Sequence, residues 1–208
     1  MPTDCIPFKE TGYFSQLICD YLAEAESLKP FYNRFPSIEN FEDQIKQKQE
    51  NFSQKNRSVL VKTLQEQYNL LQTSEATDTN IRLLADNKTF TITTGHQLNL
   101  FTGPLYFLYK IVSTINLTKQ LKIQYPEYNF VPIYWMASED HDFEEINYFN
   151  FKGKKIRWNK NASGAVGDLD TNGLADVLDL FAKELGIGNN AKYLKALIEN
   201  AYLKHDNL

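Results

Sequence analysis

The residues best suited to chemistry form an acidic cluster at the end of an apolar run. Five carboxylates and one histidine fall within seven positions: Glu139, Asp140, His141, Asp142, Glu144 and Glu145. Like charges at this spacing raise one another's pKa values unless a cation or a helix N-terminus relieves them. The cluster predicts a divalent-metal site, a general acid–base pair, or a site for a positively charged substrate group. Four residues are therefore candidate catalytic groups: Glu139, Asp140, His141 and Asp142.

His141 is the best candidate for proton transfer in this cluster, because it alone titrates near neutral pH. A structural explanation of the acids competes with the catalytic one. A helix that begins near Asp140 or Asp142 would favour acidic residues in its first turn, where the helix dipole is positive. That explanation accounts for the acids after position 142, but it leaves Glu139 and His141 unexplained.

A second polar stretch, residues 93–104, has a glycine near each end. Glycine lets the backbone turn tightly or approach a ligand closely, and a loop that leads into a helix presents N–H groups to an anion. The candidate substrate- or anion-binding residues here are Gly95, His96, Gln97, Asn99, Thr102, Gly103 and Lys110. Several alternatives stay open. The first concerns His96, which could act as a base, bind a phosphate, or be a loop histidine whose hydrogen bonds are satisfied within the loop. The second concerns Asn99 and Thr102, which could contact a ligand or stabilise the loop. The third concerns Lys110, whose ammonium could be solvated or could reach an anion.

The elements around the two clusters predict an α/β fold. Residues 89–92 are rich in residues that favour β-structure, which predicts a strand. Apolar residues from Leu105 to Ile115 recur at helical spacing, which predicts a helix, and Pro104 is suited to its start. Residues 130–136 form an apolar run typical of a central strand that is buried on both faces. Strand, helix and strand make a βαβ unit with parallel strands, so both polar clusters should lie at the same carboxyl edge of the sheet, where ligands bind in such folds.

The remaining residues divide the chain into three predicted parts. Residues 1–85 are a helical N-terminal region, 86–160 hold the βαβ core with a hairpin at 148–158, and 161–208 are a further helical segment. Helices are expected at 173–185 and 190–204, separated by Gly186 and Gly188. One βαβ unit makes a small sheet, so we expect the helices at 12–85 and 173–204 to cover its faces and the sheet to keep an incomplete edge. We also expect the chain to be the front part of a longer protein.

Composition excludes several classes of protein. A net charge of −4 argues against nucleic-acid binding, and the sequence has no apolar run of membrane-spanning length. Cys5 and Cys19 fit reduced thiols in a cytosolic protein. The P-loop, the G-x-G-x-x-G fingerprint and the H-E-x-x-H, C-x-x-C and G-x-S-x-G motifs are all absent from the sequence.

The two polar clusters and their surroundings resemble one enzyme family, the cysteine-adding enzymes, or cysteine ligases, of bacillithiol biosynthesis. The matching segments are Thr94–Gln97, Leu100–Tyr106, Tyr109–Lys110, Val131–Pro132, Trp135, Glu139–Phe143 and Glu145–Asn147. The resemblance adds Asn147 to the candidate substrate- or anion-binding residues. Position 96 is usually glutamine in the family, so His96 is not expected to be an obligatory base.

The resemblance implies a cytoplasmic enzyme that adds L-cysteine to glucosaminyl-malate. It also implies a Rossmann-like core, a helical coiled-coil part used for homodimer formation, and a nucleotide such as ATP or ADP, which would bind without a P-loop. No residue is assigned as a metal ligand, and this part of the protein is expected to be inactive by itself, because the rest of the protein would complete the cleft. Two other functions stay open: a metal-dependent hydrolase or deacetylase-like enzyme that uses the cluster from Glu139 to Asp142, and a non-catalytic interaction module.

Overall fold

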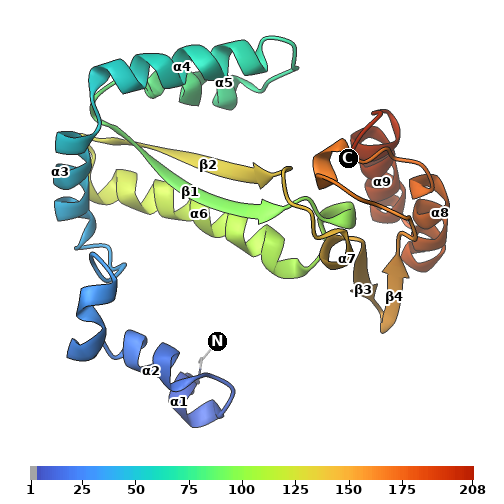
Figure 1. Ribbon diagram of the computed structural model, residues 1–208, viewed down its shortest axis with the longest axis horizontal. Helices are drawn as coiled ribbons and strands as arrows, with labels where there is room; N and C mark the ends of the chain where they lie inside the picture. Colours follow the sequence, from blue (N-terminus) through green and yellow to red (C-terminus); the bar gives the residue numbers. More distant parts are fainter. Residues whose placement is uncertain (1–3) are drawn as a thin grey trace. The chain divides into compact units, whose positions relative to one another are not determined.

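The computed structural model describes residues 4–208, which form two compact units: the residues up to Lys88, and Thr89–Leu208. The first unit is helical, as the sequence predicts. Its elements are α1 Phe8–Thr11, α2 Gln16–Leu22, η1 Glu26–Phe31, α3 Phe41–Asn51, α4 Gln54–Tyr68 and α5 Glu75–Leu83 (Figure 1). Serines at the N-caps of α2, α4 and α5 each accept a backbone N–H of the first turn, which satisfies a donor that the helix itself cannot.

Buried Arg57 ties α4 to the end of α5 inside the first unit. Its guanidinium donates to the carbonyl oxygens of Leu84, at 3.2 Å, and Asn87, at 3.4 Å. Burial lowers the pKa of Arg57 from its usual value, although a guanidinium remains charged at any physiological pH. The first unit therefore uses a charged side chain as an internal hydrogen-bond donor to the backbone.

The second unit begins with the predicted βαβ arrangement. Strand β1 Thr89–Gln97 pairs in parallel with β2 Asn129–Ala137, and helix α6 Leu105–Gln124 packs against both (Figure 1). The short 3-10 turn η2, Leu100–Thr102, joins β1 to α6. The mixed α/β fold with parallel strands is thus confirmed.

Two expectations about the strands are wrong. Strand β1 does not end at Ile92 but continues to Gln97, because its pairing with β2 extends to Ala137. Strand β2 is not a central strand buried on both faces: in the described residues its sheet has two strands, and Trp135 and Met136 are exposed. The apolar run indicated burial, but within residues 4–208 no third strand pairs with β2 to provide it.

The C-terminal half of the second unit packs around a hairpin, and its hydrophobic core also includes Leu100 and Phe101 from the loop after β1. Its elements are α7 Phe143–Ile146, β3 Tyr148–Phe151, β4 Lys154–Arg157, η3 Val166–Asp168, α8 Leu174–Leu185, α9 Asn189–Ile198 and the π-helix η4 Glu199–Leu203. The hairpin and both helices are confirmed. However, α8 packs against β4 and η4 rather than covering the parallel sheet as we expected. Trp158, Val166 and Leu174 are fully buried in this core.

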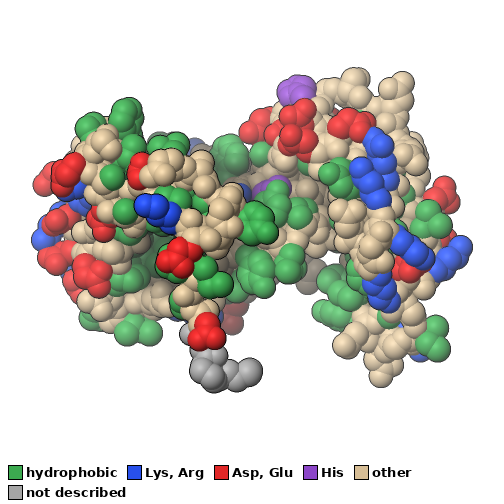
Figure 2. Space-filling view, turned by 90° about the horizontal axis from the view of Figure 1, so that it is seen from below, with side chains coloured by type: hydrophobic (Ala, Val, Ile, Leu, Met, Phe, Trp, Pro, Cys, Tyr) green, Lys and Arg blue, Asp and Glu red, His purple; other side chains and the backbone are tan. Residues whose placement is uncertain are grey.

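Helix α6 keeps much of its apolar surface exposed. Leu105, Tyr106, Leu108, Tyr109, Val112 and Ile115 are all more than one third exposed, and Figure 2 shows apolar side chains gathered over this helix. None of the helices in the described part of the chain is long and apolar enough to cross a membrane.

Candidate functional site

The two polar clusters meet at the carboxyl edge of the parallel strands. Gln97 is the last residue of β1 and lies opposite Ala137, the last residue of β2. Its amide nitrogen donates to Asp140 Oδ2 at 3.1 Å and to Glu145 Oε2 at 2.9 Å. The expectation that both clusters share one edge of the sheet is therefore confirmed by a direct contact between them.

Asp140 is the best-connected member of the acidic cluster. Its second carboxylate oxygen accepts the backbone N–H of Asp142 at 2.8 Å. This bond, followed by the one from Gln97, lowers the pKa of Asp140 below its ordinary value. The expectation of a raised pKa is therefore wrong for Asp140, because hydrogen bonds to the ionised carboxylate outweigh the effect of its desolvation.

The other candidate catalytic residues are solvent-exposed. Glu139, His141 and Asp142 all lie on the surface. A short helix, α7, begins directly after Asp142 and has Glu144 and Glu145 in its first turn, as the structural explanation expected, although the Asp142 side chain makes no capping hydrogen bond. Among residues 4–208, no three His, Cys, Asp or Glu side chains are grouped so that they could hold a metal ion.

His96 has partners on both ring nitrogens. Asn99 Nδ2 lies 2.7 Å from Nδ1, and the Tyr106 hydroxyl lies 2.9 Å from Nε2. Nδ1 also lies 3.2 Å from the carbonyl oxygen of Gln97, so each ring nitrogen has a hydrogen-bond partner in either tautomer. Of the three alternatives for His96, the geometry supports the loop histidine whose bonds are satisfied.

The loop that follows β1 is held in an unusual backbone conformation. Phe101, Thr102 and Gly103 have φ values of 47°, 72° and 53°, a region that residues other than glycine rarely adopt. A Cβ atom on Gly103 would lie 2.6 Å from the Cβ of buried Asn99. Gly103 and Asn99 therefore shape the loop, and the structural alternative for Asn99 is the one supported. Thr102 is exposed.

Lys110 lies on α6 and reaches back to the end of β1. Its ammonium donates to the carbonyl oxygen of Gly95 at 2.5 Å. This holds a positive charge against the backbone of β1 near its carboxyl end. A Cβ on Gly95 would lie 3.2 Å from the Cβ of Trp135 on the neighbouring strand, so the glycine also permits close pairing of β1 with β2.

Tyr202 supports the site, although nothing in the sequence singled it out. Its hydroxyl donates to the carbonyl oxygen of Asn99 at 3.0 Å, and its ring packs edge-on against Phe101. Burial raises the pKa of Tyr202, so it stays a protonated donor. The π-helix that carries it has no local sequence signal, because Tyr202 reads as an ordinary apolar position of a helix.

A later loop fixes the acidic segment from the other side. The backbone N–H groups of Val166 and Gly167 donate to the carbonyl oxygens of Asp140, at 2.7 Å, and Ser138, at 2.9 Å. A Cβ on Gly167 would lie 2.6 Å from the Cβ of Ser138. No pattern in the sequence connects these two segments.

Asn147 does not join the other candidate binding residues. Its side chain is buried and makes no hydrogen bond to any described residue. It lines a different pocket, together with Arg157, Asn159, Lys160 and Asn161. The expectation that Asn147 belongs to the site at the sheet edge is thus not met by any contact.

Comparison with known proteins places these features in a family. The model for the N-terminal Rossmann-like domain of the bacillithiol biosynthesis protein BshC matches residues 1–208. Proteins named "Putative cysteine ligase BshC" are 64% identical in Flavobacterium johnsoniae and 62% identical in Flavobacterium psychrophilum, in each case over 100% of this chain and 39% of the relative. One from Cytophaga hutchinsonii is 44% identical over 84% of this chain and 33% of its own length.

The chain thus spans about two fifths of the length of its Flavobacterium relatives. The family match covers both polar clusters, the parallel strands and the hairpin core. By this match and these identities, the chain belongs to the BshC family and corresponds to its N-terminal Rossmann-like domain.

Proposed function

We propose that this domain is part of a ligase that joins L-cysteine to glucosaminyl-malate in bacillithiol biosynthesis. Family membership and the cysteine ligase name of the relatives support this activity. The two substrates are those that the sequence resemblance implies. The observation that carries the proposal is the contact of Gln97 with Asp140 and Glu145 at the carboxyl edge of β1 and β2.

Two carboxylates that share one amide donor are suited to binding an ammonium group. A carboxylate has about four acceptor positions, so Asp140 and Glu145 retain oxygen lone pairs after they accept from Gln97. The lowered pKa keeps Asp140 ionised at neutral pH. We assign this pair to the amino group of cysteine or of the glucosamine moiety, with Gln97 as the residue that orients both carboxylates.

His141 is our candidate for removing a proton from the attacking amine. An amine is a nucleophile only when it is neutral, and a neutral imidazole can accept its proton. His141 is exposed and adjacent in sequence to Asp140, so a bound amine at Asp140 would lie within its reach. Glu139 and Asp142 add negative charge around that position.

The anionic part of a substrate or nucleotide fits the other half of the edge. Lys110 and the N-terminal turn of α6 supply positive charge and backbone donors beside Gly95. A nucleotide would supply activation of the carboxyl group that is joined to the amine. We further propose, from the resemblance, that the protein acts in the cytoplasm and as a homodimer.

The test uses the full-length Flavobacterium johnsoniae relative beside this chain. Each protein is given L-cysteine and glucosaminyl-malate, and mass spectrometry measures the formation of the cysteine adduct. Replacing the residue equivalent to Asp140 by Asn should lower the rate at least tenfold, because an amide cannot balance an ammonium charge. Replacing the residue equivalent to Lys155, on the hairpin, by Ala is the control and should leave the rate unchanged. Equal rates for both variants would remove Asp140 from the site, and no adduct from the unsubstituted relative would refute the activity.

A further inference from the structure

The turn η3 holds the backbone of the acidic segment at residues 138–140. The N–H of Val166 donates to the carbonyl oxygen of Asp140 at 2.7 Å, and the N–H of Gly167 donates to that of Ser138 at 2.9 Å. Both distances are usual for N–H···O hydrogen bonds. Two neighbouring donors thus hold two alternate carbonyls, so the position of η3 fixes the position of this backbone.

Position 167 has no room for a side chain. Gly167 does not have a positive φ, so its backbone conformation alone does not require glycine. A Cβ atom on Gly167 would lie 2.6 Å from the Cβ of Ser138, 3.0 Å from its carbonyl oxygen and 3.3 Å from its Cα. The last two atoms belong to the backbone and cannot turn aside as a side chain can. Any larger residue would therefore push η3 and residues 138–140 apart.

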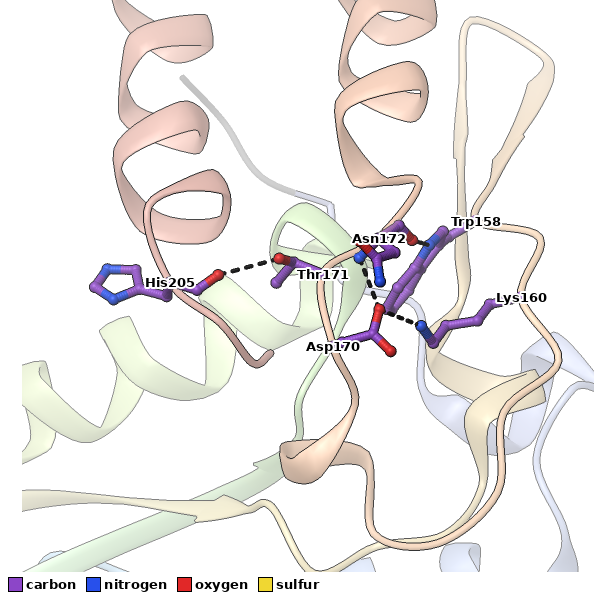
Figure 3. A network of polar contacts seen from close by, with 6 residues as sticks. All are labelled: Trp158, Lys160, Asp170, Thr171, Asn172 and His205. Carbon is purple, nitrogen blue, oxygen red and sulfur yellow. Dashed lines mark hydrogen bonds and ion pairs between the residues drawn. The ribbon is translucent and has the colours of Figure 1, made fainter.

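The loop that carries η3 is closed at its base. Trp158, whose ring is fully buried, donates from Nε1 to the carbonyl oxygen of Asn172 at 2.9 Å. Lys160 pairs with Asp170 at 2.6 Å, and the N–H of Asn172 donates to the same Asp170 oxygen at 3.0 Å (Figure 3). These contacts join the two ends of the loop, so η3 between them is not free to swing away.

The turn η3 is also anchored in the hydrophobic core around the hairpin. Val166 is fully buried, and Leu169, directly after the turn, is 7% exposed. Close-packed interiors are hard to compress and transmit strain. A displacement forced at Gly167 would therefore reach residues 138–140 rather than be absorbed by η3.

The hydrogen bond between Gln97 and Asp140 depends on where this backbone lies. Gln97 reaches the carboxylate from the end of β1, at 3.1 Å, whereas the backbone that carries Asp140 is held by η3. A side-chain hydrogen bond is lost at a separation of about 3.6 Å. A displacement of the acidic segment by much less than one bond length is therefore enough to break this contact.

We propose that Gly167 is a positioning residue of the site. It lets η3 approach Ser138 closely enough to place the Asp140 carboxylate against Gln97, which also holds Glu145. Gly167 acts through the backbone of residues 138–140 and not by contact with a substrate. The identity of the bound group, an amine in its ammonium form, rests on the proposed function; the contact between Gln97 and Asp140 does not.

The first test is an NMR titration of the Asp140 carboxyl carbon in the 208-residue chain. Gly167→Ala should raise the pKa of Asp140 toward its ordinary value and shift the side-chain amide resonances of Gln97, because their hydrogen bond is lost. Adding Ser138→Gly removes the atom 2.6 Å away and should reverse most of both changes. The matched control is Gly188→Ala, since Gly188 has an ordinary φ of −65° and open space around an added Cβ. It should leave Asp140 unchanged.

Val166→Ala tests the same role without adding an atom, should Gly167→Ala fail to fold. It removes apolar contacts that anchor η3, so the pKa of Asp140 should rise here too. Its control is Val177→Ala: Val177 is 5% exposed in the same core but lies on α8, so this variant should lose stability and leave Asp140 unchanged. An unchanged Asp140 titration in Gly167→Ala, or in Val166→Ala where the first variant does not fold, would overturn the proposal. An equal shift in either control would do the same.

The second test is kinetic and uses the full-length Flavobacterium johnsoniae relative. Replacing the residue equivalent to Gly167 by Ala should raise the KM of the substrate whose amine is bound by roughly fivefold or more and change kcat less, because binding before the reaction is weakened. An unchanged KM would refute the role of Gly167. If the unsubstituted relative forms no adduct, the ligase activity is refuted, and the titration of Asp140 alone decides the role of Gly167.

Discussion

Asp140 receives the backbone N–H of Asp142 on one carboxylate oxygen and the amide of Gln97 on the other. Both bonds favour the ionised form, so the pKa of Asp140 is lower in the folded protein than in the unfolded chain. Its stabilising contribution is therefore fully present above the unfolded pKa and is lost as the pH falls through the folded pKa. Because the side chain is only partly buried, this contribution is small, and the lowered pKa matters more for keeping the site charged.

Gln97→Ala should raise the pKa of Asp140 toward the ordinary value without restoring it fully, because the larger cause, the Asp142 N–H, remains. The measurement is an NMR titration of the Asp140 carboxyl carbon. Gln16→Ala is the matched control, since it removes an amide-to-carboxylate bond to Asp20 and should leave Asp140 unaffected. An unchanged titration in Gln97→Ala would show that the bridge between the two clusters does not form in solution.

At the scale of elements, the loop after β1 depends on the π-helix at the far end of the second unit. Phe101 and Thr102 have positive φ values, which costs free energy that the surrounding packing must offset. Tyr202 supplies part of that packing through the Asn99 carbonyl and the Phe101 ring. π-Helical turns are often found at functional sites, and here the turn points a donor at the loop beside Gln97.

Tyr202→Phe removes only the hydroxyl, so the stability of the protein should fall by about 1 kcal/mol, the typical contribution of one hydrogen bond. Chemical denaturation measures this change. The amide hydrogens of Thr102 and Gly103 should also exchange faster, because the loop loses its anchor.

Tyr193→Phe is the control for Tyr202→Phe, since Tyr193 is 68% exposed. It should alter neither the stability nor the exchange of the loop. Identical exchange rates in both variants would mean that the loop holds its conformation without Tyr202.

At the scale of the molecule, apolar surface remains uncovered on the second unit. One face of α6 and the end of β2 both carry exposed apolar side chains, as the view in Figure 2 shows for the helix. Contiguous apolar surface of this kind is typical of an interaction site. The relatives in Flavobacterium contain much additional sequence, since this chain matches 39% of their length.

We expect the 208-residue chain to bind a dye that reports exposed apolar surface and to self-associate. The double substitution Leu108→Gln and Val112→Gln should reduce both, because it places amides on the exposed face of α6. Leu70→Gln, at a leucine of the first unit that is 92% exposed, is the control and should have little effect. A monomeric chain that melts cooperatively and binds no dye would show that the apolar face is covered in solution.

The sequence by itself determined the local elements and the direction of the strands. The βαβ unit, the hairpin and the last helices could be predicted, because their signals lie in residues that are close together in the sequence. These signals include the helical spacing after Pro104, the apolar run at 130–136 and the glycines at 186 and 188. Parallel strands have their carboxyl ends at one edge, which is why the meeting of the Gln97 loop with the acidic cluster could also be predicted.

Only the tertiary structure decided which side chains act together. The hydroxyl of Tyr202 and the carbonyl of Asn99 are 103 positions apart, and no local pattern encodes such a contact. The lowered pKa of Asp140, the exposure of Trp135 and the separate pocket of Asn147 likewise depend on what lies beside each group in space. Burial, pKa and hydrogen-bond satisfaction are properties of that environment, so the residue types alone do not fix them.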